Sequence, residues 1–342
     1  MYTIKNLNAN NVDDIKDLYK NFLDRAIADY KFEVRPLLFE DFKENVKNSF
    51  IKGFYLEEND IPTCFLFYVD TINEAVELNL IHCLDESCIN EKRSEITKFF
   101  TEYVKKNSDK KVISYPMMGI QDTFVQNIAY IGYKLVGQAV LRFDFKNPIC
   151  IKILDDSKTA DCLQKVQIGN GDNQEVDLSA NYTIDSWHDN YYEEIVQIIH
   201  EQFKEASDTL FDPRFKTIEG TENVVKNIVE NIYGIFLQDA TTVLKFNDKV
   251  CGVCFANMTT EKEANIPLVA IKKPHHHKGF GAMILKHTIR KLREIRGERG
   301  IDMLVSVNAT TDTDNYPAMR MYRKIGFKEI YNYPHAYFKL KI

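Results

Sequence analysis

The chain has 342 residues, more than one typical hydrophobic core, which predicts two domains, and its 44% hydrophobic and 27% charged residues are typical of a globular protein. A formal net charge of −6 argues against a broad nucleic-acid-binding surface, because phosphate neutralisation needs clustered Lys and Arg. We find no apolar membrane span, no signal peptide and no disulfide-like cysteine spacing. We therefore expect a cytoplasmic protein with reduced thiols that binds neither membrane nor nucleic acid.

The first half of the chain alternates segments with strand and helix periodicity. No glycine occurs between Gly53 and Gly119, so the strand expected near 75–82 has no glycine turn after it. We expect strands at 3–8, 53–60, 62–70, 75–82, 111–115 and within 133–145, and helices at 12–27, 40–50, 90–106 and 122–131, the last ending at Gly132.

Residues 146–180 differ in composition from both flanks. They contain Gly169, Gly171 and many Asp and Asn residues, together with apolar patches. We interpret this range as a linker that carries a strand or two, because Gly, Asn and Asp favour turns. The predicted domains are therefore 1–145 and 181–342.

The second half repeats the element order of the first, which predicts a duplicated domain, although the residues of the two halves match weakly. We expect strands at 182–187, 241–246, 249–258, 266–271, 301–307, 328–333 and 335–342, and helices at 189–206, 222–232, after Gly281 and at 317–325, the last ending at Gly326.

The stretch 266–285 is the most suggestive of chemistry. It passes from a β-branched apolar run through a basic turn, 272–281, into an amphipathic helix. A strand, a Gly-x-Gly turn and a helix present free backbone N–H groups to an anion at the helix N-terminus. Gly279 and Gly281 let the backbone approach a ligand. A basic surface loop before an ordinary helix is the alternative.

This stretch resembles motif A of the GNAT (GCN5-related N-acetyltransferase) superfamily, V-x-P-x-x-R/Q-x-x-G-x-G/A. Aligned on Gly279 and Gly281, the chain has Ile271 in the Val position. Two positions depart from the pattern. The proline is one residue late, at Pro274, and His276 stands where Arg or Gln is usual. The second departure leaves the backbone cradle intact and changes one side-chain contact.

A second motif strengthens the resemblance, which covers about residues 181–342. The family pattern N-x-x-A-x-x-L-Y-x-x-x-G-F is matched, with Met for Leu, although the buried face of any short helix would explain part of it. The resemblance implies an α/β (α+β) fold of two GNAT-like domains, each a mixed, mostly antiparallel twisted sheet flanked by helices. The matching residues are Asn315, Ala318, Met321, Tyr322, Gly326 and Phe327.

The resemblance also implies acetyl-CoA as co-substrate. The backbone of Val269, Ala270 and Ile271 would bind its pantetheine arm, and the Ile271 amide would stabilise the thioester oxyanion. The pyrophosphate would lie on the following turn. The turn residues are His276, His277, Lys278, Gly279, Phe280, Gly281 and Ala282.

Two residues of the second motif have implied roles. Asn315 would contact the CoA arm, and Tyr322 would be the general acid that protonates the CoA thiolate. A core tyrosine is the alternative for Tyr322. By the same resemblance Glu261 or Glu263 is a possible general base, although each could equally be a solvated hairpin charge. When Gly132 is aligned with Gly326, Ile128 replaces the acid, so we expect a degenerate first copy.

Two other patterns are interpreted as structural. The run His275–His277 lacks nearby Asp, Glu or Cys, and adjacent residues cannot all face one ion, so we expect no metal site. Cys251 and Cys254 lie in a predicted strand, where residues three apart point to opposite faces. We therefore expect two buried thiols there.

Our hypothesis is an acetyl-CoA-dependent N-acetyltransferase that acts on a primary amine, most simply of a small molecule, by direct attack in a ternary complex. The alternative is a non-catalytic CoA or acyl-CoA sensor on the same fold. A transferase that uses aminoacyl-tRNA fits the acidic chain and the CoA-type turn less well. The acceptor and the oligomeric state stay open.

Overall fold

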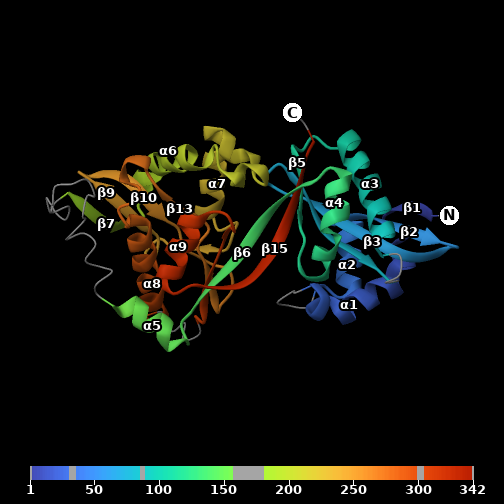
Figure 1. The fold of residues 1–342 in the computed structure, drawn as a ribbon, viewed down its shortest axis with the longest axis horizontal. Helices are drawn as coiled ribbons and strands as arrows, with labels where there is room; N and C mark the ends of the chain where they lie inside the picture. Colours follow the sequence, from blue (N-terminus) through green and yellow to red (C-terminus); the bar gives the residue numbers. More distant parts are fainter. Residues whose placement is uncertain (1, 31–35, 85–88, 157–180, 299–303, 341–342) are drawn as a thin grey trace. The chain divides into compact units, whose positions relative to one another are not determined.

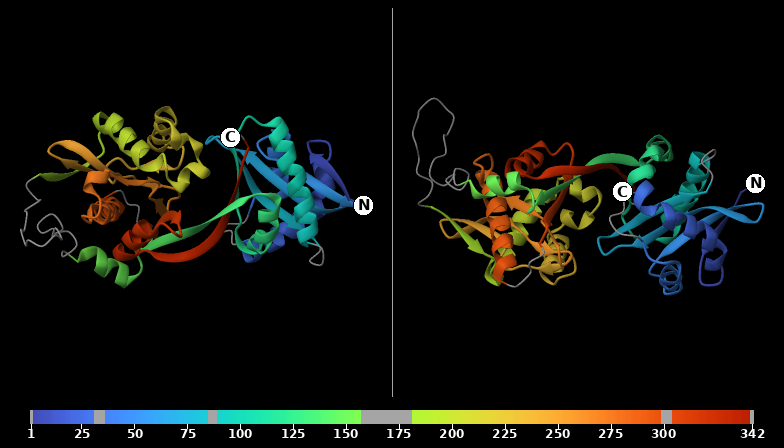
Figure 2. Two further views of the ribbon diagram at one scale, coloured as in Figure 1. Left: turned by 45° about the horizontal axis from the view of Figure 1, so that its top comes forward. Right: turned by 90° about the horizontal axis from the view of Figure 1, so that it is seen from below.

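The computed structural model describes residues 2–30, 36–84, 89–156, 181–298 and 304–340 (Figure 1 and Figure 2). Their contacts define two compact units, neither of which is continuous in sequence, unlike the predicted ranges. Strands β6 and β15 each begin in one unit and end in the other. Unit 1 comprises Met1–Gln138, Leu210–Pro213 and Tyr333–Ile342, and unit 2 comprises Ala139–Thr209 and Arg214–Asn332.

Unit 1 is a mixed sheet with helices on both faces (Figure 1). Its strands pair in the order β1, β2, β3, β4, β5 and the end of β15, and only β4 and β5 are parallel. The elements are β1 (Tyr2–Leu7), α1 (Lys16–Tyr30), α2 (Phe39–Lys47), β2 (Lys52–Glu58), β3 (Ile61–Asp70), β4 (Ala75–Cys83), α3 (Ile89–Asn107), β5 (Val112–Pro116), α4 (Val125–Ile131) and β15 (Lys328–Lys339).

Alternation along the strands divides the core of unit 1 into two layers. Tyr55 and Phe65 pack with α1 and α2 on one face of the sheet. Phe54 and Leu66, each one residue away in sequence, pack with α3 and α4 on the other face. Both faces are therefore covered.

Unit 2 has two groups of paired strands. One group has the order β13, β10, β9, β7, and the other has β6, β14, β12, β11, β8, in which β12 and β14 are parallel. The elements are the end of β6 (Lys134–Asp144), α5 (Pro148–Asp155), β7 (Tyr182–Ser186), α6 (Tyr192–Phe203), α7 (Ile218–Val229), β8 (Ile235–Phe236), β9 (Thr242–Phe246), β10 (Lys249–Cys254), β11 (Asn257–Met258), β12 (Glu263–Asn265), β13 (Val269–Ile271), α8 (Phe280–Glu298), β14 (Ser306–Asp312) and α9 (Tyr316–Ile325).

The core of unit 2 follows the same alternation. Val243 and Val253 pack with α6 and α7. Leu244 and Cys254 face the opposite layer, which α8 and α9 cover. The helix that begins after the glycine turn is thus held against β9 and β10 by its apolar face.

Helix α5 occupies the start of the predicted linker. Its buried residues Cys150 and Leu154 belong to the core of unit 2. Lys286 of α8 is itself buried, and its Nζ donates to the carbonyls of Ile153 and Asp156 at 2.8 and 2.6 Å. This cation thus satisfies carbonyls that the end of a helix leaves unpaired. The rest of the predicted linker, 157–180, lies outside the described residues.

The predicted fold class is confirmed, but two strand predictions are wrong in position. Of the strand expected at 301–307, residues 301–303 lie outside the described residues, and the observed strand is Ser306–Asp312, where pairing with β12 begins. The strands expected at 328–333 and 335–342 form one strand, which continues through Pro334. The Pro334 carbonyl accepts from the Met117 amide at 2.9 Å, so this proline still takes part in backbone pairing.

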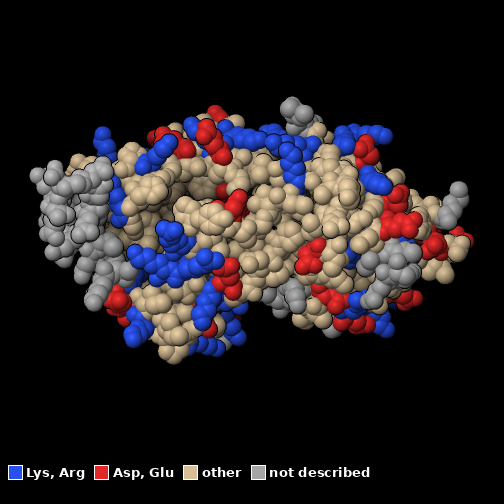
Figure 3. Space-filling view, viewed as in Figure 1, with Lys and Arg blue, Asp and Glu red and all other residues tan. Residues whose placement is uncertain are grey.

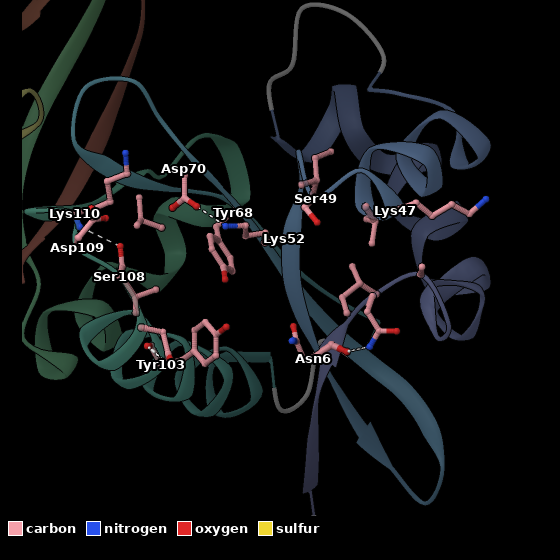
Figure 4. Close-up of a pocket in the computed structure, with 18 residues that line it drawn as sticks. Asn6, Lys47, Ser49, Lys52, Tyr68, Asp70, Tyr103, Ser108, Asp109 and Lys110 are labelled. Atoms are coloured by element: carbon pink, nitrogen blue, oxygen red, sulfur yellow. Dashed lines mark hydrogen bonds and ion pairs between the residues drawn. The ribbon is translucent and has the colours of Figure 1, made fainter.

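A pocket of about 500 Å³ lies in unit 1, outside every residue that the sequence analysis singled out for chemistry (Figure 4). Its walls include Asn6, Tyr103 and Lys110, and an ion pair of 2.5 Å joins Lys52 to Asp70. Mixed charge of this kind does not define one class of ligand.

No described helix combines the length and apolar character that a bilayer span requires.

Deleting residues 333–342 should destabilise unit 1. Strand β5 would lose its antiparallel partner, in which Ala336 lies opposite Tyr115, and the buried side chains of Ala336 and Tyr337 would be lost. We expect amide hydrogen exchange in β5 to accelerate by at least about tenfold, measured by mass spectrometry, while exchange in β9 of unit 2 serves as the internal control. Unchanged protection of β5 would contradict this expectation.

Candidate active site

The candidate site lies where two paired strands of unit 2 separate. Strands β12 and β14 are parallel partners from Glu263 opposite Ser306 to Asn265 opposite Asn308. The Ile266 amide still donates to the Asn308 carbonyl at 2.9 Å. Beyond that point the chain pairs with β10 as β13, so β13 is the edge of its group of strands.

The hydrogen-bond pattern decides which peptide groups of β13 face away from β10. The Lys272 amide donates to the Cys251 carbonyl at 2.8 Å, and the Phe255 amide donates to the Leu268 carbonyl at 3.0 Å. Because hydrogen-bonded pairs alternate in an antiparallel ladder, the peptide groups of Val269 and Ile271 face away from β10.

This alternation bears on the three backbone positions expected to bind the cofactor. Ala270 lies opposite Val253, at a position where both peptide groups face β10. Its backbone is therefore engaged within the sheet, and its contact with a ligand stays a prediction. Val269 and Ile271 have the orientation that a ligand requires.

His276 is held against the end of this strand. Its Nε2 lies 2.6 Å from the Ile271 carbonyl oxygen, and because a carbonyl only accepts, Nε2 is the donor. An Arg or Gln side chain in the same position could make the same donation. His276 in this position therefore fixes the turn to the end of β13.

The turn before α8 has the backbone form of an anion nest. His277 has a φ of 61° and Gly279 a φ of 81°, and these left-handed residues flank Lys278. Such alternation directs successive N–H groups toward one side, next to the N-terminus of α8. Gly279 is needed because other residues adopt this φ at a cost.

Gly281 has a different reason to be glycine. A Cβ added there would lie 3.0 Å from Sδ of Met321, on α9. Gly281 therefore allows α8 and α9 to pack closely. This contact brings α9 beside the turn, and Figure 3 shows basic side chains gathered over α9. They include Arg320, Arg323 and Lys324.

The three adjacent histidines have different partners. The Tyr182 hydroxyl lies 2.7 Å from Nδ1 of His275, and the Tyr182 ring packs against Phe280 at 4.4 Å between centroids. Burial lowers the pKa of His275, and Lys278 and Lys272 add to this effect. Within the described ranges, no group of three or more His, Cys, Asp or Glu side chains is placed to hold a metal.

Tyr322 is buried on α9, with 5% of its surface exposed, and its ring meets Phe327 edge-on at 5.0 Å. Burial raises the pKa of Tyr322 far above its usual range, and the nearby Cys254 and Asp208 add to this effect. Cys254 lies opposite Val269, so the phenol is close to the strand that presents free amides. A phenol that stays protonated at neutral pH has the form a general acid requires.

Asn315 has a structural task in addition to the predicted one. Its Oδ1 accepts from the Ala318 amide at 3.2 Å, which caps the N-terminus of α9. The capping bond explains the Asn-x-x-Ala spacing without a ligand. Contact with the CoA arm stays a prediction.

Glu263 lies at the start of β12, where the strands are still paired. Its Oε1 accepts from the Ser306 hydroxyl at 3.1 Å and lies 3.5 Å from Nη2 of Arg142.

The site also contains an acid that sequence reasoning missed. Asp208 is close enough to Tyr322 to raise its pKa. The adjacent Ser207 hydroxyl donates to Asp312 at the end of β14. No local sequence pattern links Ser207, Asp208 and Asp312 to Tyr322, so the sequence alone did not identify them as part of the site.

Unit 1 has the same strand separation, but a side chain fills it. Ile81 follows Ala75, the first residue of β4 in the parallel pair, by the same number of residues as Val269 follows Glu263, the first residue of β12 in its parallel pair. The Ile81 amide donates to Oε1 of Gln121 at 3.3 Å, and the Tyr115 hydroxyl donates to the same oxygen at 2.8 Å. Gln121 precedes the helix-ending Gly132 by the same number of residues as Asn315 precedes Gly326. An internal amide thus occupies the place that a ligand would need.

One expectation about the thiols of β10 is wrong. Cys251 and Cys254 are both buried, but they belong to the same core layer, not to opposite faces. The ladder with β9 shifts between Val250 and Gly252, so Cys251 is the extra residue of a β-bulge. A bulge reverses the alternation that the spacing assumed.

Comparison with known proteins gave one family match and several structural ones. Residues 192–327 match the model of the acetyltransferase (GNAT) family. A comparison with curated proteins found no match. The tandem GNAT protein from the clavulanic acid biosynthesis pathway is 10% identical over 100% of this chain and 99% of that chain, with a TM-score of 0.53.

Two further solved structures are similar. The GCN5-related N-acetyltransferase from Sphaerobacter thermophilus is 11% identical over 100% of this chain and 96% of that chain, with a TM-score of 0.61. The glucosamine N-acetyltransferase region of a fungal multi-domain GH3 β-N-acetylglucosaminidase is 12% identical over 99% and 38%, with a TM-score of 0.61. At these identities the likeness is one of fold. Residues 192–327 therefore match the GNAT-family model, in a chain whose fold is like that of the tandem GNAT protein and the GCN5-related N-acetyltransferase.

Proposed function

We propose that the protein is an acetyl-CoA-dependent N-acetyltransferase with its active site in unit 2, acting on a primary amine of a small molecule. The observation that carries this proposal is the position of Tyr322. A buried, protonated phenol lies near Cys254, directly across the ladder from Val269, whose peptide groups face away from the sheet. Bound acetyl-CoA would supply the acetyl group as a thioester.

The residues of unit 2 suggest a division of tasks. The amides of Val269 and Ile271 would hold the pantetheine arm and stabilise the oxyanion, while the turn from His276 to Ala282 would hold the pyrophosphate. The hydroxyl of Tyr322 would give its proton to the sulfur as the C–S bond breaks and the C–N bond forms. The basic side chains of α9 beside the turn favour the same negatively charged ligand.

The base that takes the proton of the amine has two candidates. Glu263 is engaged by Ser306 and Arg142 at the start of β12. Asp208 influences Tyr322 directly, and we propose it as the base that also attracts a cationic acceptor.

Replacement of Tyr322 by Phe tests the general acid. We expect kcat to fall by about 10²–10⁴-fold with little change in KM for acetyl-CoA, because the ring stays and only the proton donor is lost. Steady-state kinetics with the best acceptor from an amine library would measure it. Tyr316→Phe is the matched control, since Tyr316 lies on the same helix and is 72% exposed. Full activity in Tyr322→Phe would refute the assignment.

Replacement of Gly279 by Val tests the turn. A β-branched residue is strained at a φ of 81°, so the nest should distort and CoA affinity should fall by at least about tenfold in calorimetry. Gly132→Ala, at a φ of 107° in unit 1, should destabilise the protein and leave CoA affinity unchanged. Wild-type affinity in Gly279→Val would remove the support for a cradle. Intact CoA binding by the wild-type chain, with no product from the amine library, would favour the sensor.

The loss of kcat/KM on removal of each carboxylate separates the two base candidates. Asp208→Asn should lower kcat/KM by about 10²-fold, because the proton acceptor is removed. Glu263→Gln should keep kcat/KM close to the wild type and lose mainly stability, since it removes an ion pair with Arg142. The reverse result would assign the base to Glu263.

A further inference from the structure

Two cysteines of unit 1 are placed for a reaction with each other. Cys64 of β3 lies directly opposite Cys83, the last residue of β4. The adjacent pair is hydrogen-bonded, with the Leu84 amide donating to the Thr63 carbonyl at 3.0 Å. The cysteines therefore occupy a non-hydrogen-bonded pair, in which Cα atoms approach to about 4.5 Å. That separation lies within the range that a disulfide spans.

The sulfur atoms are already close. Sγ of Cys83 lies 2.7 Å from Sγ of Cys64, and both side chains are buried. A bond between them, about 2.05 Å long, would require only a small movement of side chains on two fixed strands. Both cysteines are free thiols.

A buried cation lies near this pair. The Arg93 side chain on α3 is 1% exposed, and its Nε and Nη2 have no hydrogen-bond partner among the described residues. Its Nη1 donates to the Thr123 hydroxyl at 3.4 Å, and the Tyr30 hydroxyl also bonds to this side chain. A guanidinium keeps its proton in proteins, so burying one with two N–H groups unsatisfied is costly. Arg93 therefore favours a negative charge beside it.

The described groups that feel the charge of Arg93 are phenols, an imidazole and a thiol. Burial lowers the pKa of His82 to about 3, with Arg25 and Arg93 adding to the effect, so His82 stays neutral. Burial raises the pKa of the Cys64 thiol, and Arg93 and Lys92 act against that rise. Cys64 is thus the thiol of this cluster whose thiolate Arg93 stabilises.

We propose that Cys64 and Cys83 form a reversible disulfide by exchange with a small-molecule disulfide, and that Arg93 stabilises the thiolate of the reduced pair. One cysteine thiolate attacks a sulfur of the small disulfide, and a small thiolate leaves. The second cysteine thiolate then attacks the mixed disulfide and expels the other small thiolate. The cysteines are oxidised, the small disulfide is reduced to two thiols, and the two cysteine protons pass through solvent to the leaving thiolates.

The role of Arg93 fixes the direction of one effect. At a pH where the Cys64 thiolate forms, a group that stabilises this thiolate stabilises the reduced form, and so makes the disulfide easier to reduce. Removal of the positive charge should therefore strengthen the disulfide. A side chain that only filled space would weaken the unit without this directional change.

The test uses the full chain in glutathione buffers of graded redox poise, with alkylation of remaining thiols and peptide mass spectrometry. We expect a Cys64–Cys83 cross-link that grows with oxidised glutathione and disappears on reduction. Cys83→Ala should abolish it, while the double variant Cys251→Ala, Cys254→Ala should keep it. Thiols that stay free throughout, or cross-links between other cysteines only, would overturn the proposal.

Arg93→Met should raise the equilibrium constant for disulfide formation by about tenfold or more, which corresponds to 29.6 mV for this two-electron couple. Arg93→Lys keeps the charge and should stay close to the wild type. Arg93→Lys also serves as the folded comparison if Arg93→Met is unstable. In that case an equilibrium constant for disulfide formation that is about tenfold higher in Arg93→Lys than in the wild type would contradict the role of charge. An unchanged or lower constant in a folded Arg93→Met chain would do the same.

Discussion

The separation of β13 from β14 is the constraint on which the rest of unit 2 depends. A strand can bond to one partner on each side, and once β13 pairs with β10 on one side, no described strand pairs with its other side. The peptide groups of Val269 and Ile271, two residues apart on β13, then both point into the space between β13 and β14. The turn, the His276 bond and the close contact at Gly281 all follow at the end of that strand. The chemistry proposed for this domain needs donors whose direction is fixed before a ligand arrives.

Unit 1 provides an internal comparison for this arrangement. Its β4 and β5 also begin as parallel partners and then separate, yet Gln121 and Tyr115 close the gap with side-chain hydrogen bonds. A polar group inside a core must be bonded, so a vacated ligand position has to be refilled by the protein. The sequence suggested this loss only through a missing glycine turn and Ile128. It carried no hint that an amide side chain had taken the place of a ligand.

Sequence reasoning succeeded where the cause is local and failed where it depends on distant partners. The glycine turn and the helix that follows lie within one stretch, and strand and helix periods were sufficient to predict the fold class. The thiols of β10 were misassigned because a bulge at Cys251 exists only in the pairing with β9. The strand through Pro334 was divided because a proline resembles a break when its partners are unknown. Asp208 lies in a short 3-10 helix, Ser207–Leu210, that no sequence motif connects to Tyr322.

The interleaving of the two units bears on how the protein is made. A ribosome releases the chain from its N-terminus, and domains commonly fold as they emerge. Here β5 emerges well before its partner residues His335–Lys339, because the whole of unit 2 lies between them in the chain. Until these residues emerge, β5 has an open edge beside the buried strands of unit 1, and such edges invite pairing with other chains. Unit 1 thus stays incomplete while unit 2 is being made, and the nascent chain has a long interval in which a chaperone that shields strand edges would be of use.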